Sequence, residues 1–304
     1  MHSDATCSWL DDAARDVARL VDDTEPALQR RLRPLVERIA RMNGGDGLRD
    51  ALLRPGSTPF VRIIDAAALD LGLAGDPRVA SIGRATVMSY LYVRLQDDLV
   101  DEEALIDRAS VYAMEVALAE HLRHLADAGV PAKFWRARSR VMARFAAFAA
   151  REVDERGAAE GAPAERHGDK FLPLAVPLLA LASLAGRDAL HDVLIDHVVH
   201  LGAALQVIND VLNAAEDRAA ERTTPFLRWL GPLDAPDLGA FRAAVQAHPA
   251  TDRALALARA QAGRAASLAA AHELARLAGL AGAVERLVDR TRPRLLGLQL
   301  GIQA

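Results

Sequence analysis

Cysteine is nearly absent from this sequence, and there is no excess of positive charge. Cys7 is the only cysteine among 304 residues, which excludes an intramolecular disulfide and a cysteine-based metal site. This cysteine usage is consistent with a reducing compartment, so we expect a cytoplasmic protein. The formal net charge is −4, and lysine and arginine are interspersed with acidic residues. No basic surface for nucleic acid is therefore predicted.

Long apolar runs are also missing. The longest run extends from Phe171 to Gly186, is shorter than a membrane span and contains Pro173 and Pro177. We interpret it as a buried helix of a soluble protein. The first twenty residues carry several aspartates and lack the continuous apolar core of a signal peptide, so neither secretion nor an integral membrane span is expected.

The composition favours helices over strands. Hydrophobic residues make up 51% of the chain but aromatic residues only 4%, and alanine and leucine dominate. We therefore predict an all-α protein in which residues 1–304 form a single domain. Helices are expected over residues 8–22, 26–43, 48–53, 58–73, 77–100, 102–128, 131–156, 170–184, 188–215 and 224–230, followed by two Ala/Leu-rich helices that Thr251 and Gly282 help to delimit, with a loop at 157–163.

An acidic segment, Gln96–Glu103, closes the long helix that starts near Pro77. On a helix Asp97 shares a face with Asp101, and like charges at this spacing repel each other unless a cation compensates them. Mg²⁺ favours a few such carboxylate oxygens together with water and phosphate. A solvated acidic helix end is the alternative, because three acidic residues at this spacing occur by chance roughly once in a chain of this composition.

A second polar helix end follows about 110 residues later. Asn209, Asn213 and Asp217 stand at positions i, i+4 and i+8, so they present two amide oxygens and a carboxylate on one stripe. Such a stripe suits one further Mg²⁺ whose remaining positions a phosphate fills. The alternative is that the asparagines only cap or solvate the helix end. Antiparallel packing in a bundle would bring both polar ends to the mouth of one cavity.

These two segments resemble the motifs of class I isoprenoid synthases, the superfamily of trans-prenyltransferases and class I terpene synthases. Gln96–Glu102 resembles the first aspartate-rich motif. Leu201–Asn213 is similar to the prenyltransferase pattern G-x-x-x-Q-[IV]-x-D-D-x-x-D, and the stripe that ends at Asp217 also fits the terpene synthase form N-D-x-x-[ST]-x-x-x-[ED]. The resemblance covers roughly residues 80–230. It implies an α-helical bundle with a central active-site cavity.

The resemblance also implies roles for single residues. Asp97 and Asp101 would hold two Mg²⁺ ions, and the stripe of Asn209, Asn213 and Asp217 would hold a third, with Mn²⁺ as an alternative metal. Lys170 and Arg222 would neutralise the diphosphate of a prenyl diphosphate substrate, and Asp98 would act with them in catalysis. The residues expected to line the substrate site are Tyr92, Val93, Arg166, Lys170, Gln206 and Arg222. A homodimer is common among the proteins that the motifs resemble.

Departures from the prenyltransferase pattern concern the second substrate. Prenyltransferases carry an arginine pair after the first motif, which is missing here, and an N-terminal G-G-K-R-x-R segment. The best match to that segment is Gly44–Arg49, in which Asp46 and Gly47 replace the lysine and the first arginine. An acid at this place disfavours the binding of a second diphosphate. The sequence therefore predicts a terpene synthase that ionises and cyclises one prenyl diphosphate.

The sequence does not exclude two other functions. The chain could be a trans-prenyltransferase that condenses an allylic diphosphate with isopentenyl diphosphate, or a catalytically silent partner subunit. The sequence also departs from the terpene synthase pattern, because the C-terminal Arg-Tyr pair is missing and Pro163 occupies the place of a phosphate-sensing arginine. Arg166 is the nearest substitute.

Overall fold

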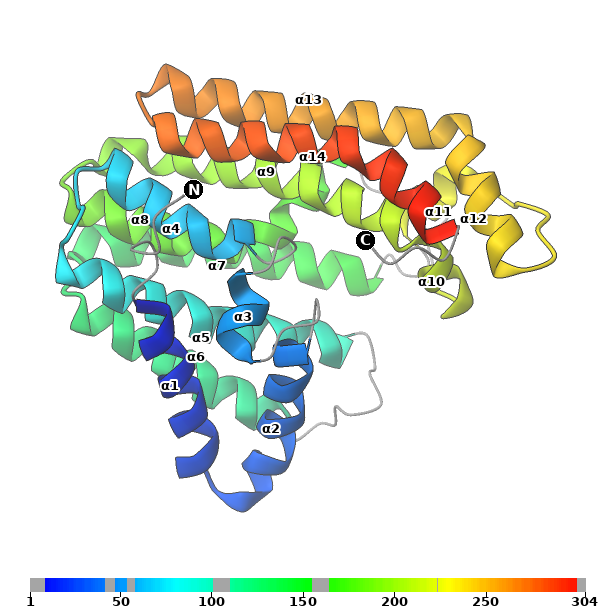
Figure 1. Ribbon diagram of the computed structural model, residues 1–304. Helices are drawn as coiled ribbons and strands as arrows, with labels where there is room; N and C mark the ends of the chain where they lie inside the picture. Colours follow the sequence, from blue (N-terminus) through cyan, green and yellow to red (C-terminus); the bar gives the residue numbers. More distant parts are fainter. Residues whose placement is uncertain are drawn as a thin grey trace. The chain divides into compact units, whose positions relative to one another are not determined.

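The structure is a computed structural model that describes residues 9–41, 47–53, 58–100, 110–154, 164–222 and 224–299. These residues form helices and their connections and contain no β-strand, which confirms the predicted all-α class (Figure 1). The predictions for Asp46, Asp101 and the loop at 157–163 lie outside the described residues. No described helix is long and apolar enough to cross a bilayer.

The chain divides into two compact units, residues 1–140 with 173–191 and residues 141–172 with 192–304. The first unit contains the start of α7 (Ala132–Asp154), up to Arg140, and the short 3-10 helix η4 (Asp188–Leu190). Its other helices are α1 (Trp9–Asp23), α2 (Pro26–Arg41), α3 (Leu48–Leu53), α4 (Thr58–Asp70), α5 (Pro77–Val100), α6 (Ser110–Asp127) and α8 (Ala175–Leu184). The single domain predicted for 1–304 stays a prediction.

Helix α5 is the centre of the first unit and packs against α1, α4, α6 and α8. It begins where the sequence predicts, because the Asp76 carboxylate accepts the backbone N–H of Arg78 at 2.9 Å and Pro77 opens the helix. Gly83 lets α1 approach closely, since a Cβ atom there would lie 2.4 Å from the Trp9 ring. The α5 face that carries Leu91 and Leu95 is fully buried.

The second unit contains the rest of α7 (Ala132–Asp154) and the 3-10 helix η3 (Ala164–Leu174). Its other helices are α9 (His191–Leu212), α10 (Ala214–Ala219), α11 (Pro225–Leu230), α12 (Leu238–Ala247), α13 (Pro249–Ala271) and α14 (Ala275–Gln299). Helices α13 and α14 pack side by side along their length (Figure 1). His197 Nδ1 lies 3.0 Å from the Ala265 carbonyl oxygen, a contact that links α9 to α13.

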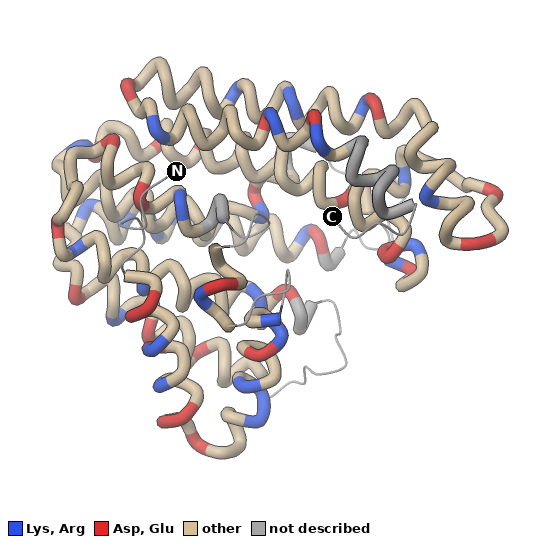
Figure 2. Tube along the Cα trace, in the orientation of Figure 1, with Lys and Arg blue, Asp and Glu red and all other residues tan. Residues whose placement is uncertain are grey.

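The structure corrects two predicted helices. The helix expected over 170–184 is a 3-10 helix up to Leu174 and becomes α-helical only at Ala175, because Pro173 has no N–H to donate. Gly282 lies inside α14 instead of delimiting the last two helices. The break falls at His272–Leu274, where Glu273 adopts a φ of 60°. Charges of both signs are interspersed along the described helices, as the sequence predicts (Figure 2).

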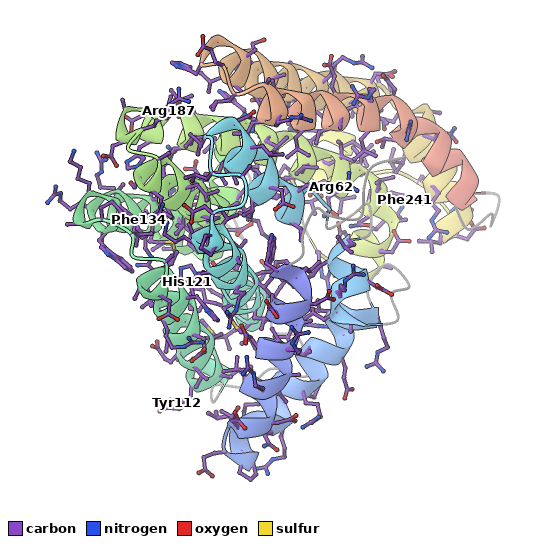
Figure 3. All side chains as sticks on the ribbon, turned by 60° about the vertical axis from the view of Figure 1, so that its left-hand side comes forward. Arg62, Tyr112, His121, Phe134, Arg187 and Phe241 are labelled. Atoms are coloured by element: carbon purple, nitrogen blue, oxygen red, sulfur yellow. The ribbon has the colours of Figure 1, made fainter. Side chains whose placement is uncertain are left out.

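His121, labelled in Figure 3, gives the first unit a testable pH dependence. Burial lowers its pKa to about 4, the Ala85 carbonyl 2.8 Å from Nδ1 opposes this effect, and Arg138 and His124 reinforce it. The unfolded chain therefore binds more protons between pH 6.5 and 4, so stability falls as the pH falls through this window. We expect His121 to account for about 2 kcal/mol of lost unfolding free energy between pH 7 and pH 5.

Urea unfolding of the wild type and of His121→Gln at both pH values measures this loss. The wild type should lose about 2 kcal/mol more than the variant on acidification. Equal losses in the two proteins would show that His121 does not remain neutral in the folded state.

Candidate active site

The first acidic motif lies at the C-terminal end of α5, in the first unit. Asp97 is the only acidic residue of this motif whose side chain the structure describes, because the side chain of Asp98 and all of Asp101 lie outside the described residues. The Asp97 carboxylate is 23% exposed, and its Oδ2 lies 3.2 Å from Arg94 Nη1. Asp97 is therefore partly buried beside a cation on the preceding turn.

Tyr90 lies near Asp97. It stands seven residues earlier on the same helix face. Burial is the main cause that raises the pKa of the Tyr90 hydroxyl, and the charge of Asp97 adds to it, while Arg94 and Arg38 oppose the shift. Sequence reasoning named Tyr90 only among the aromatic residues, although its spacing of seven from Asp97 indicates a shared face.

Tyr92 and Val93, predicted to line the substrate site, are both partly exposed. Burial raises the pKa of Tyr92, and its charged neighbours are Glu115 of α6, which raises it further, and Arg138 of α7, which lowers it. The structure thus places Tyr92 near α6 and α7, whereas Tyr90 is the tyrosine near Asp97. The proposed role of Tyr92 in the substrate site stays a prediction.

The second motif lies in the second unit, where α9 gives way to α10. Asn213 interrupts the helix, but its N–H donates to the Asn209 carbonyl at 2.9 Å and the Asp217 N–H donates to the Asn213 carbonyl at 2.8 Å. The predicted i, i+4, i+8 spacing is therefore kept across the break. The two asparagines are exposed, and Asn213 Nδ2 donates to Asn209 Oδ1 at 2.9 Å.

Asp210 and Asp217 are the buried acids of this segment, 5% and 9% exposed. They stand seven residues apart, so they share a stripe that also contains Gln206, whose Nε2 donates to Asp210 Oδ1 at 2.7 Å. Burial raises the pKa of Asp210 to about 7; Gln206 and Lys170 lower it, while Asp217 and Glu152 of α7 raise it. Sequence reasoning missed Asp210 and Glu152 as site residues.

Lys170 and Arg222, the two cations predicted to neutralise the diphosphate, lie near Asp210 and Asp217, respectively. Lys170, in η3, is close enough to Asp210 to act on its charge. The Arg222 N–H donates to the Asp217 carbonyl at 2.8 Å, and Arg222 Nη1 lies 3.7 Å from Asp217 Oδ1. Arg166 also lies in η3, but its side chain is outside the described residues. We call Glu152, Lys170, Gln206, Asp210, Asp217 and Arg222 the second-motif cluster.

The donor types of the segment Asn209–Asp217 suit a hard divalent cation. Asp210 and Asp217 offer carboxylate oxygens, Asn209 and Asn213 of the same segment offer amide oxygens, and Mg²⁺ in proteins is held by one or two carboxylates together with water and phosphate. Burial is the main cause of the raised pKa of Asp210, so a bound cation would stabilise the ionised form of this carboxyl. Within the described residues, no three His, Cys, Asp or Glu side chains form a metal-binding group by themselves. Phosphate or water oxygens would have to complete the coordination.

Comparison with known proteins shows the fold. No protein-family model matches the sequence, and no curated protein matches it. A geranylgeranyl pyrophosphate synthetase from the archaeon Geoglobus acetivorans superposes with a TM-score of 0.62 at 17% identity, covering 91% of this chain and 99% of the other. A polyprenyl synthase from Caulobacter crescentus, solved with calcium and isoprenyl diphosphate, gives 0.62 at 18% identity, covering 94% and 99%.

A geranylgeranyl pyrophosphate synthase from Corynebacterium glutamicum, solved with isoprenyl diphosphate and magnesium, gives a TM-score of 0.60 at 13% identity. It covers 91% of this chain and 98% of its own. The chain therefore has the all-α fold of the class I isoprenoid synthases, as its motifs predict.

Proposed function

We propose that this chain, which has the isoprenoid synthase fold, is an enzyme that ionises an allylic prenyl diphosphate with the help of divalent metal ions. The observation that carries the proposal is the pair of buried acids Asp210 and Asp217 beside the cations Lys170 and Arg222. Buried carboxylates are costly unless a cation compensates them. Similar folds solved with isoprenyl diphosphate and with calcium or magnesium support the same chemistry.

The residues of the two motifs would bind metal ions. Asp97 and Asp101 would hold Mg²⁺ at the first motif. The stripe of Asn209, Asn213 and Asp217 would hold a further Mg²⁺ at the second motif, where Asp210 would add negative charge. Bound Mg²⁺ would supply positive charge to the departing diphosphate.

Lys170 and Arg222 would donate hydrogen bonds to the diphosphate oxygens. They would stabilise the leaving group more as it departs than in the ground state, which is the condition for a faster reaction.

The reaction that we propose first is prenyl transfer. The allylic C–O bond breaks, diphosphate leaves, and the carbocation adds to the double bond of isopentenyl diphosphate, which then loses a proton. The similar solved structures are named polyprenyl and geranylgeranyl pyrophosphate synthases, and this favours condensation over the cyclisation that the sequence predicted. Homodimer formation and a cytoplasmic location stay predictions.

Cyclisation of a single substrate remains the second candidate, because of Arg49. This arginine is the one cation left in the Gly44–Arg49 segment, where prenyltransferases bind diphosphate. Its Nε lies 2.8 Å from Asp11 Oδ1, and its Nη1 lies 3.7 Å from Asp50 Oδ1. An arginine engaged by two carboxylates is less available to a second diphosphate, which favours a one-substrate reaction.

Product analysis separates the two reactions. Purified protein is incubated with Mg²⁺ and geranyl, farnesyl or geranylgeranyl diphosphate, with and without isopentenyl diphosphate, and the products are identified by mass spectrometry. Longer prenyl diphosphates that form only with isopentenyl diphosphate are expected from a prenyltransferase. Cyclic hydrocarbons or alcohols from one substrate alone would instead establish a terpene synthase. No turnover under any condition would contradict the proposal and favour a silent partner subunit.

A further inference from the structure

A cavity of about 810 Å³ opens on the first unit, where the start of α7 faces the segment that joins α8 to α9. Figure 3 labels Phe134, the buried residue that precedes Trp135 on α7. Its wall includes Lys133, Trp135, Arg136 and Arg140 of α7, with Asp188 and His191 opposite. No residue of this wall belongs to the candidate active site, so the proposed function leaves the cavity unexplained.

The α7 side of the cavity is strongly basic. Lys133, Arg136 and Arg140 stand at positions i, i+3 and i+7, so they lie on one helix face and span about 10 Å. Lys133 Nζ lies 3.5 Å from Asp188 Oδ2, a surface ion pair in which the lysine side chain is 69% exposed. Among the described residues, Arg136 and Arg140 have neither a carboxylate partner nor a hydrogen bond. The wall thus holds two exposed arginines that have no carboxylate partner among the described residues.

The opposite side of the cavity is fixed by hydrogen bonds. The Ser183 hydroxyl donates to Asp188 Oδ1 at 2.7 Å and lies 3.0 Å from His191 Nε2. The Ser183 hydrogen bond is the main cause that lowers the pKa of Asp188, and Lys133 and His191 add to it. Asp188 is therefore ionised at neutral pH and lies beside Lys133. Hydrogen bonds therefore fix the side of the cavity opposite the two arginines.

We propose that this cavity binds a small phosphorylated molecule through Arg136 and Arg140. Arginine pairs match phosphate oxygens in charge and in hydrogen-bond geometry. The cavity volume lies in the range of small-molecule sites, which favours a compact ligand over an extended macromolecule. The Trp135 ring offers a flat apolar surface for the organic part of the ligand.

The probe for this site is inorganic triphosphate, titrated calorimetrically into the full chain in EDTA, so that metal-dependent binding at the candidate active site is excluded. The double variant R136Q/R140Q should bind it at least about ten-fold more weakly than the wild type. The matched control is R253Q/R290Q, which removes two exposed arginines from α13 and α14 with the same change in net charge. The control should bind as the wild type does.

Fluorescence gives a second readout, because Trp135 lines the cavity. Triphosphate should change the tryptophan emission of the wild type, and Trp135→Phe should abolish that change. The turnover of prenyl diphosphates should be unchanged in R136Q/R140Q. Binding is measured without substrate, so failure of the proposed function would leave this test intact.

The proposal would be overturned if the wild type bound no triphosphate. It would also be overturned if R136Q/R140Q bound triphosphate as the wild type does, or if R253Q/R290Q lost as much binding as R136Q/R140Q. Sedimentation with vesicles that contain phosphatidic acid distinguishes a lipid headgroup from a free ligand. Vesicle binding that depends on Arg136 and Arg140, without binding of free triphosphate, would also overturn the proposal of a small soluble ligand.

Discussion

Replacing Asp210 with asparagine should lower kcat for prenyl diphosphate at least about 100-fold while leaving the folded protein at least as stable as the wild type. The loss of activity follows because Asp210 supplies negative charge to the proposed metal site. Stability should not fall, because asparagine keeps the size of the side chain and an oxygen that accepts the Gln206 N–H. The variant also removes a buried carboxylate, which is costly to ionise.

The pH dependence of stability in the metal-free protein shows whether ionisation of Asp210 stabilises or destabilises the folded state. Burial raises the pKa of Asp210 to about 7 in the folded state, so the folded state binds more protons than the unfolded chain between pH 4 and 7. Stability is therefore lost as the pH rises through this window, by about 4 kcal/mol for this group at pH 8. Asp210→Asn should abolish that loss in EDTA.

Steady-state kinetics and thermal unfolding at pH 8 test this prediction. Asp234→Asn is the matched control, because it makes the same chemical change at an exposed loop position and should alter neither quantity. Parallel losses of activity and stability in Asp210→Asn would show that Asp210 is structural. Full activity would remove it from the proposed metal site.

Gly168→Ala should cost at least about 3 kcal/mol of unfolding free energy. Gly168 lies in η3 against α9. A Cβ atom at this position would lie 2.0 Å from the Val199 carbonyl oxygen and 2.8 Å from the Val199 carbonyl carbon. Both neighbours are backbone atoms, so η3 itself has to move away from α9. That movement would also shift Lys170 relative to Asp210, and the activity of the folded fraction should fall with it.

Gly263→Ala is the control for this substitution. Gly263 lies inside α13, with nothing within 4 Å of an added Cβ, and alanine there should stabilise the helix by about 0.5 to 1 kcal/mol. Urea unfolding of both variants measures the contrast. Comparable stability in the two alanine variants would mean that the contact between η3 and α9 tolerates displacement.

Local signals in the sequence predicted much of the helical structure. Asp76 and Pro77 mark the start of α5, and Thr224 with Pro225 marks α11, where the Thr224 hydroxyl accepts the Leu227 N–H. Such caps depend on residues close in the chain, so a single sequence reveals them. The apolar run after Phe171 likewise predicted the buried α8.

Contacts between distant residues could not be predicted in the same way. The 3-10 form of η3 coincides with the packing of Gly168 on Val199, thirty-one residues later in the chain. The ion pair of Arg49 with Asp11 depends on how separate helices meet. The two acidic motifs could be located from their spacing, but the burial of Asp210 and Asp217, and the exposure of Asn209 and Asn213, required the fold.

Release of inorganic diphosphate tests the central claim most directly, because both candidate reactions begin by breaking the allylic C–O bond. The wild type is incubated with geranyl, farnesyl or geranylgeranyl diphosphate together with isopentenyl diphosphate, in Mg²⁺ and separately in EDTA. We predict release in Mg²⁺ with at least one substrate, its loss in EDTA and its loss in Asp210→Asn. No Mg²⁺-dependent release from any of these substrates would contradict the assignment of this chain as a metal-dependent isoprenoid synthase.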